Sequence, residues 1–205
     1  MVSFNALTAS LAACLVAVTP VMAHVTANPN MAYLDSYFQT AFRVGHGCSN
    51  SPTVKLTVDI PDGVTSVAPH QTHNWTISLN YRPLVPPVTS HGETINQTVS
   101  SVTFSGYLEP TFYEDFGISM KLPAQVPNNV LYFPVHQICV NGSTEWTGIP
   151  QPGQNGMSLP SPAASVQTVA KPAANSTTTN DAGHFISSPY SSLVLAITLL
   201  AAFSY

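Results

Sequence analysis

Residues 38–60 read FQTAFRVGHGCSNSPTVKLTVDI, and this stretch contains two runs in which every second side chain suits a buried position. The first run has Phe38, Thr40, Phe42 and Val44, and the second has Val54, Leu56, Val58 and Ile60. A period of two places alternate side chains on opposite faces of a strand. The stretch therefore predicts two β-strands, each with one face toward a core.

The same alternation continues toward the C-terminus. After a Pro61-Asp62-Gly63 turn, Trp75, Ile77 and Leu79 repeat it. Further strands are expected at residues 102–104, 112–120 and 131–138. No segment shows a capped helix with an apolar stripe. These features predict an all-β fold, an antiparallel β-sandwich of the immunoglobulin or cupredoxin-like type.

Residues 1–23 are typical of a secretory signal peptide. An apolar run, Ala6–Val18, is too short to span a bilayer and is followed by a segment that ends at Ala23 in the pattern of a cleavage site. Cleavage after Ala23 would make His24 the first residue of an extracellular protein.

Residues 151–180 are rich in Pro, Ser, Thr, Ala and Gln and contain few large apolar side chains. Such a composition buries too little surface to offset the entropy of ordering, so a disordered stalk is expected. Residues 24–150 then remain as one domain of ordinary size.

Residues 181–205 have the order of a signal for a glycolipid (GPI) anchor. Small residues surround Asn180, a polar spacer covers residues 183–192, and Leu193–Tyr205 is apolar. A short membrane helix is the alternative, but this tail falls short of the about 20 residues that a hydrocarbon core requires. We expect removal of residues 181–205, attachment at Asn180, and a lipid anchor in the outer leaflet of a eukaryotic, fungal plasma membrane or in the cell wall.

Cysteines and sequons agree with secretion. With Cys14 removed, Cys48 and Cys139 are expected to form a disulfide, and a two-cysteine metal site is the alternative. N-glycosylation sequons occur at Asn74, Asn96, Asn141 and Asn175. Nine acidic and five basic residues, with no basic stripe, argue against a nucleic-acid partner.

A histidine at a free N-terminus offers two nitrogen ligands from one residue. The α-amine and ring Nδ1 of His24 could close a chelate ring on a metal, and an α-amine pKa of about 7.7 to 8.0 allows deprotonation near neutral pH. Nitrogen ligands favour Cu(II), which tops the affinity series of divalent first-row metals. An ordinary exposed terminus is the alternative.

Two other side chains are candidate ligands. Glu114 shares parity with Phe116 and Ile118, so it either binds a metal, pairs with Arg43 or reaches solvent at the end of its strand. His136 alternates with Val135 and is either an outer-face side chain or a second ligand.

Four segments resemble the YcnI-like family of secreted copper-binding domains. They are AHVTANPN (23–30), YFQTAFRVGHGCSNSPTVKLTVDIPDGV (37–64), NWTISL (74–79) and LYFPVHQICVNGSTEW (131–146). The resemblance implies a β-sandwich that holds Cu(II) through the amine and imidazole of its first histidine, with a carboxylate helping and a tryptophan close by. His24 and Trp146 match these positions.

The carboxylate does not match, because the family glutamate falls where this chain has Phe38 or Gln39. Glu114 and Glu145 are the candidate replacements, Glu145 because it neighbours Trp146, and His136 is a further candidate.

The expected function is Cu(II) acquisition or homeostasis by a chaperone or scavenger that is not an enzyme and serves a membrane copper transporter or reductase. One alternative is a copper-dependent oxidative enzyme that acts on polysaccharide, which would need a second histidine. Another is a structural or adhesion protein of the cell wall.

Overall fold

The computed structural model describes residues 24–90 and 92–172. The expected signal peptide (1–23), the sequon at Asn175, the attachment residue Asn180 and the anchor signal (181–205) lie outside the described residues. None of the helices in the described part is long and apolar enough to cross a membrane.

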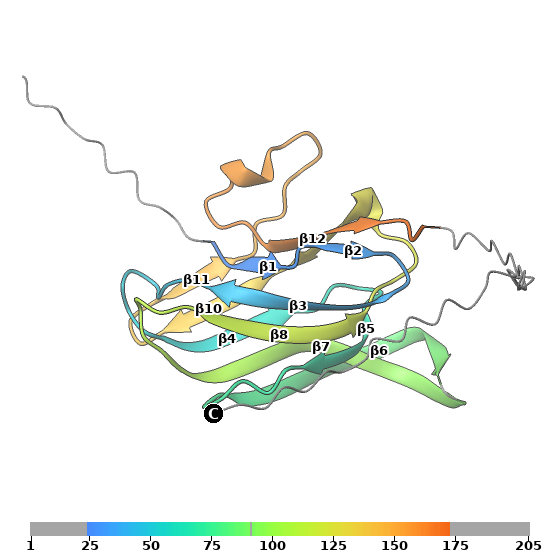
Figure 1. Cartoon of the computed structure of the whole chain (residues 1–205), viewed down its shortest axis with the longest axis horizontal. Coiled ribbons are helices and arrows are strands. Elements are labelled where there is room, and N and C mark those ends of the chain that lie inside the picture. Colours follow the sequence, from blue (N-terminus) through green and yellow to red (C-terminus); the bar gives the residue numbers. More distant parts are fainter. Residues whose placement is uncertain (1–23, 91, 173–205) are drawn as a thin grey trace, which may run out of the picture. The chain divides into compact units, whose positions relative to one another are not determined.

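Two facing sheets enclose the core, and a third, smaller sheet lies beside them (Figure 1). The four-stranded sheet has the order β1 (Thr26–Asn28), β3 (Tyr37–Val44), β8 (Glu114–Lys121) and β5 (Thr65–Pro69). The five-stranded sheet has the order β11 (Ser143–Trp146), β10 (Val135–Cys139), β4 (Thr53–Asp59), β7 (Glu93–Leu108) and β6 (Thr76–Ser90). The small sheet has the order β2 (Met31–Tyr33), β12 (Ala164–Val169) and β9 (Val130–Phe133). The described residues also form two short 3-10 helices, η1 (Pro127–Asn129) and η2 (Gly156–Ser158).

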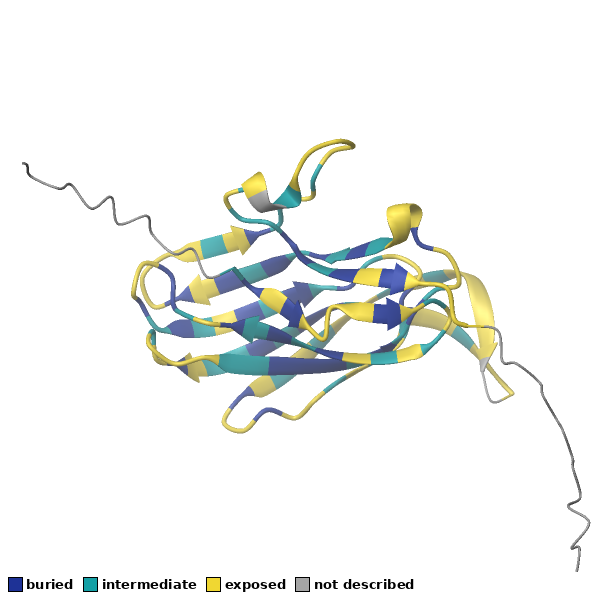
Figure 2. Ribbon diagram, turned by 45° about the horizontal axis from the view of Figure 1, so that its top comes forward, coloured by how far each residue is buried: buried dark blue, intermediate teal, exposed yellow. Residues whose placement is uncertain are grey.

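The predicted alternation in β3 and β4 is confirmed. Phe42 and Val44 in β3, and Leu56 and Val58 in β4, are almost completely buried, while the residues between them are partly or fully exposed. In Figure 2 this alternation is visible as bands of buried and exposed residues that follow one another along each strand. The fold is thus the all-β, immunoglobulin-like sandwich that the sequence predicts.

Aromatic side chains fill the space between the sheets. Phe116 of β8 lies with its ring centroid 4.8 Å from Trp75 and 4.9 Å from Phe104, and Phe42 lies 5.3 Å from Phe133. Edge-on and tilted contacts at these distances are favourable for aromatic pairs. The contact of Phe116 with Phe104 connects the four-stranded sheet to the five-stranded sheet, and the contact of Phe42 with Phe133 connects the four-stranded sheet to the small sheet.

The strand expected at residues 131–138 is two strands in different sheets. β9 ends at Phe133 and pairs with β12, whereas β10 begins at Val135 and pairs with β4. Pro134 separates them, because proline has no N–H to continue a ladder of hydrogen bonds. The prediction of one continuous strand was therefore wrong.

The prediction of a stalk from residue 151 is also wrong for part of its range. β12 runs antiparallel to β9 and parallel to β2, and Val166 is fully buried. Ala164, Val166 and Thr168 alternate with more exposed residues, but small side chains obscured the pattern. The folded unit continues through Lys171, well beyond the expected boundary at residue 150.

Candidate functional site

His24 stands just before β1, at one end of the sandwich. Val25 and Ala27 are buried, and Thr26 pairs with Arg43 of β3, so the first strand is held in the four-stranded sheet. The half-buried His24 ring has its centroid 5.7 Å from the ring of Trp146, at an interplanar angle of 60°. The structure therefore brings together the two residues that match the family motif most clearly.

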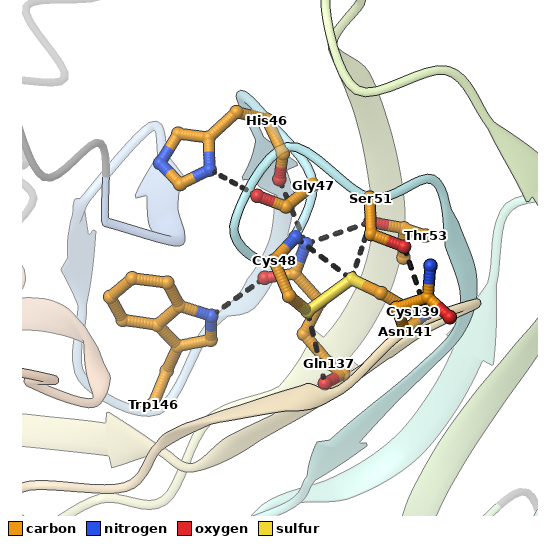
Figure 3. The surroundings of a disulfide bond; sticks show 9 residues. All are labelled: His46, Gly47, Cys48, Ser51, Thr53, Gln137, Cys139, Asn141 and Trp146. Carbon is orange, nitrogen blue, oxygen red and sulfur yellow. Dashed lines mark hydrogen bonds between the residues drawn. A yellow bond between two sulfur atoms is a disulfide. The ribbon is translucent and has the colours of Figure 1, made fainter.

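Trp146 is fixed by a buried glutamine. Its side chain is 2% exposed, and its indole Nε1 donates a hydrogen bond of 2.9 Å to Oε1 of Gln137 in β10. The Gln137 Nε2 group donates to the backbone oxygen of His46 at 2.8 Å and to Oγ1 of Thr53 at 2.7 Å (Figure 3). Because the indole N–H and the Gln137 amide form all these hydrogen bonds inside the protein, the orientation of the indole ring is well defined.

Gln137 is a site residue that the sequence analysis missed. It is 1% exposed, on the same face of β10 as Val135 and Cys139. The signal was present in the sequence, since a glutamine at a core position of an alternating strand requires buried partners.

A disulfide joins Cys48 to Cys139, so the prediction of a disulfide is confirmed and the two-cysteine metal site is wrong. The Cys48 backbone N–H also donates to Cys139 Sγ at 2.9 Å. At Gly47, an added Cβ would come within 1.7 Å of the Ser51 backbone oxygen, so only glycine fits this loop. The disulfide indicates an oxidising, extracellular compartment.

Glu114 does not pair with Arg43. The Arg43 guanidinium forms two hydrogen bonds to Asp115, at 2.8 and 2.6 Å, and this contact holds the Asp115 pKa below its ordinary value although burial opposes the shift. Glu114 instead accepts a hydrogen bond from the Asp115 backbone N–H at 3.1 Å. β3 lies between β8 and β1, so roughly 10 Å of sheet separates Glu114 from the strand that follows His24.

Glu145 and His136 lie on the other face of the five-stranded sheet. Glu145 precedes Trp146 in β11, and successive side chains of a strand point to opposite faces. His136 stands directly opposite Glu145, its Nδ1 contacts the Glu145 carboxylate, and its Nε2 lies 3.1 Å from Asp59. The four candidate ligands are therefore not gathered around one ion.

Within residues 24–90 and 92–172, no group of three or more His, Cys, Asp and Glu side chains is placed to hold a metal ion. His24 with Trp146, and His136 with Glu145 and Asp59, form two separate clusters.

The His136 cluster makes stability depend on pH. Burial alone would lower the His136 pKa, but hydrogen bonds and charge from Asp59 and Glu145 raise it above its ordinary value. This contribution is fully present below the unfolded pKa, near pH 6.5, and is lost as the pH rises through the higher folded pKa. Since all three side chains are more than a third exposed, it amounts to less than about 1 kcal/mol.

We expect the free energy of unfolding of His136→Gln to fall less than that of the parent between about pH 6 and pH 8. Urea titrations at each pH measure this, with His73→Gln at an exposed position as the matched control. Equal pH profiles for the parent and His136→Gln would contradict the assignment.

A pocket of about 440 Å³ opens beside His24. Its lining includes Asn30, Tyr132, Gly148, Asn155 and Ser165, and none of its described lining residues is an aspartate, glutamate, lysine or arginine. Residues 154–156 and 162–165, which belong to the region expected to be a stalk, contribute to this lining.

The sequons at Asn74, Asn96 and Asn141 are all at exposed positions.

These features define a class of protein: an extracellular β-sandwich in which a histidine lies beside a buried tryptophan at one end. The family described as "Domain of unknown function (DUF1775)" matches residues 24–167, and the chain belongs to this family, the YcnI-like family that its motifs resemble. The family match ends inside β12, in agreement with the corrected domain boundary.

A solved structure supports the fold. The crystal structure of an uncharacterized protein from Nocardia farcinica, which reveals an immunoglobulin-like fold, is similar with a TM-score of 0.54 and 24% identity. The similarity covers 72% of this chain and 99% of that chain. Comparison with curated proteins gave no significant match.

Proposed function

We propose that this protein binds Cu(II) outside the cell through His24 and serves copper acquisition or homeostasis as a chaperone or scavenger. The observation that carries the proposal is the position of the His24 residue, whose ring centroid lies 5.7 Å from that of the buried Trp146 and which lines a pocket without aspartate, glutamate, lysine or arginine among its described residues. Removal of residues 1–23 would add the α-amine as a second nitrogen ligand. Copper is the cargo of this site.

The donor set supports a chelate that needs only one side chain. The α-amine and Nδ1 belong to the same residue, so no cluster of three ligating side chains is required. The indole N–H of Trp146 is already bound to Gln137, which leaves the ring itself to shield one side of the ion from water. The other coordination positions would face the pocket and its neutral oxygen and nitrogen atoms.

Binding fits the geometry better than catalysis. A copper monooxygenase brace needs a second histidine, and His136 does not supply it, because both of its ring nitrogens meet carboxylates on the opposite face of the sheet. A site with one anchoring residue exchanges its remaining ligands easily, which suits transfer to a membrane copper transporter or reductase. An oxidative enzyme would instead oxidise a polysaccharide when loaded with copper and given a reductant.

Anchorage to the outer leaflet through Asn180 is part of the same proposal. The described domain ends after β12, and the remaining chain has the residue order expected of an anchor signal. Release of the protein from cells by a phospholipase specific for glycolipid anchors would support it.

The test is a Cu(II) titration of the protein that begins at His24, followed by tryptophan fluorescence and electron paramagnetic resonance. We expect one equivalent of Cu(II) to bind, with coupling to two nitrogens and quenching of Trp146. Trp146→Phe should lose most of the quenching while Trp75, the other tryptophan of the chain, still fluoresces. Quenching that persists in Trp146→Phe, or binding unchanged in His24→Gln, would refute the proposal.

A further inference from the structure

A second pocket, of about 400 Å³, lies at the opposite end of the sandwich. It includes Tyr37, the first residue of β3, whereas His24 lies near the level of the last residues of the same strand. The length of β3 separates these two places by roughly 23 Å. This groove is therefore independent of the proposed copper site.

The groove exists because the two sheets differ in length. β6 and β7 continue well past the ends of the short strand β5 and of β8, as Figure 1 shows for the long hairpin. Among the described strands of the facing sheet, β5 and β8 therefore leave part of the inner face of the hairpin beyond Val99 uncovered. A register shift at Asn80 and Tyr81 marks this point, and bulges are common next to binding sites.

Two exposed tyrosines flank the groove. The Tyr37 side chain is 66% exposed and the Tyr81 side chain is 56% exposed, although both belong to strands. Val88 and Ile95 add apolar surface to the lining of the groove. Large aromatic surface in a groove gives an incoming ring a face on which to pack.

The rest of the lining is polar and uncharged, with one exception. Ser66, Thr89 and Gln97 offer hydroxyl and amide groups. Lys121 is the charged residue among the described lining residues, and its Nζ lies 2.7 Å from the Asp35 carboxylate and donates to the Asp35 backbone oxygen at 2.6 Å. Because Asp35 neutralises this cation, the groove does not favour an anionic ligand.

We propose that this groove binds a neutral oligosaccharide with β-linked, glucose-type rings. Such rings have flat faces of C–H groups that pack on tyrosine and a rim of hydroxyls that hydrogen-bond to side chains such as Gln97 and Ser66. Both requirements are met in one groove by residues from β3, β5, β6 and β7. The proposal does not depend on copper.

Occupancy of the sequon at Asn96 has to be controlled. Asn96 lies between Ile95 and Gln97, which line the groove, although Asn96 is not itself a lining residue. Measurements on Asn96→Gln alongside the parent exclude binding effects of an attached glycan.

The test uses residues 24–172, because the folded unit with its complete core ends at Lys171. Cellohexaose, laminarihexaose and chitohexaose are titrated in turn by NMR, with trigalacturonate as the anionic comparison. We expect at least one neutral probe to bind with a Kd on the order of 1 mM or tighter. Tyr37→Ala and Tyr81→Ala should each weaken this binding about tenfold.

Tyr107→Ala is the matched control, because Tyr107 is 57% exposed on β7 and lies outside the groove. Its affinity should equal that of the parent. No binding of any neutral probe at about 10 mM, equal affinities for the parent and the two groove variants, or preference for trigalacturonate would each overturn the proposal. Probe binding that the full-length chain loses would show that residues 173–205 fill the groove instead, which also overturns it.

Discussion

An N-terminal leader of glycine and serine fused to His24 is expected to weaken Cu(II) binding by about 10² to 10⁴-fold. The leader moves the charged amine away from the imidazole, so the second nitrogen no longer arrives as part of the same residue. The measurement is a competition titration against a chelator of known affinity, on one fusion protein before and after proteolytic removal of the leader.

The two forms, with and without the leader, are compared within a single preparation. The fold, the His24 ring and the Trp146 contact are the same in both forms. A difference in Cu(II) affinity is therefore due to the α-amine. His73→Gln serves as the control for adventitious binding, because His73 is exposed and not among the residues that line the His24 pocket. Equal affinities with and without the leader would show that the chain start is not a ligand.

Replacement of both Cys48 and Cys139 by alanine is expected to lower the free energy of unfolding by about 3 to 5 kcal/mol. The two cysteines are 91 residues apart, so their bond restricts a large part of the unfolded chain. Both side chains are buried, and their truncation also removes packing around Gln137. Urea unfolding under oxidising conditions measures the change.

The double variant should still bind Cu(II) where it remains folded, since neither nitrogen ligand of His24 lies on the loop that the disulfide closes. Gln125→Ala, at an exposed position between the two cysteines, is the control and should change stability by less than about 0.5 kcal/mol. A loss below about 1 kcal/mol in the double variant would contradict the expected role of the disulfide.

Alternating apolar residues predicted the fold well where one face of a strand is buried. β3 and β4 have this property, and their buried residues agree with the pattern in the sequence except at the start of β4, where a register shift buries Thr53 in place of Val54. The pattern failed for β12, because alanine and serine carry little hydrophobic signal even when neighbouring strands cover them. It also joined β9 to β10, since alternation continues across Pro134 although hydrogen bonding does not.

The candidate site was predicted less completely. His24 and Trp146 were found from local motifs, and their contact agrees with them. Glu145 was chosen because it adjoins Trp146 in sequence, but adjacent residues of a strand face opposite ways. Arg43 binds Asp115 and not Glu114 because the register of β3 and β8 places Arg43 opposite Asp115, and no single-strand pattern contains that register.

The parallel pairing of β12 with β2 has a further consequence for how the protein would work on a cell. The chain runs away from His24 through β1 and β2, and β12 runs in the same direction, so Lys171 leaves the domain roughly 25 to 30 Å from His24. A membrane attachment downstream of Lys171 would hold the histidine at the distal tip of the molecule. Loading would then take place from the surrounding medium, and delivery would require either a receptor with a tall ectodomain or a domain that tilts down toward the lipid surface.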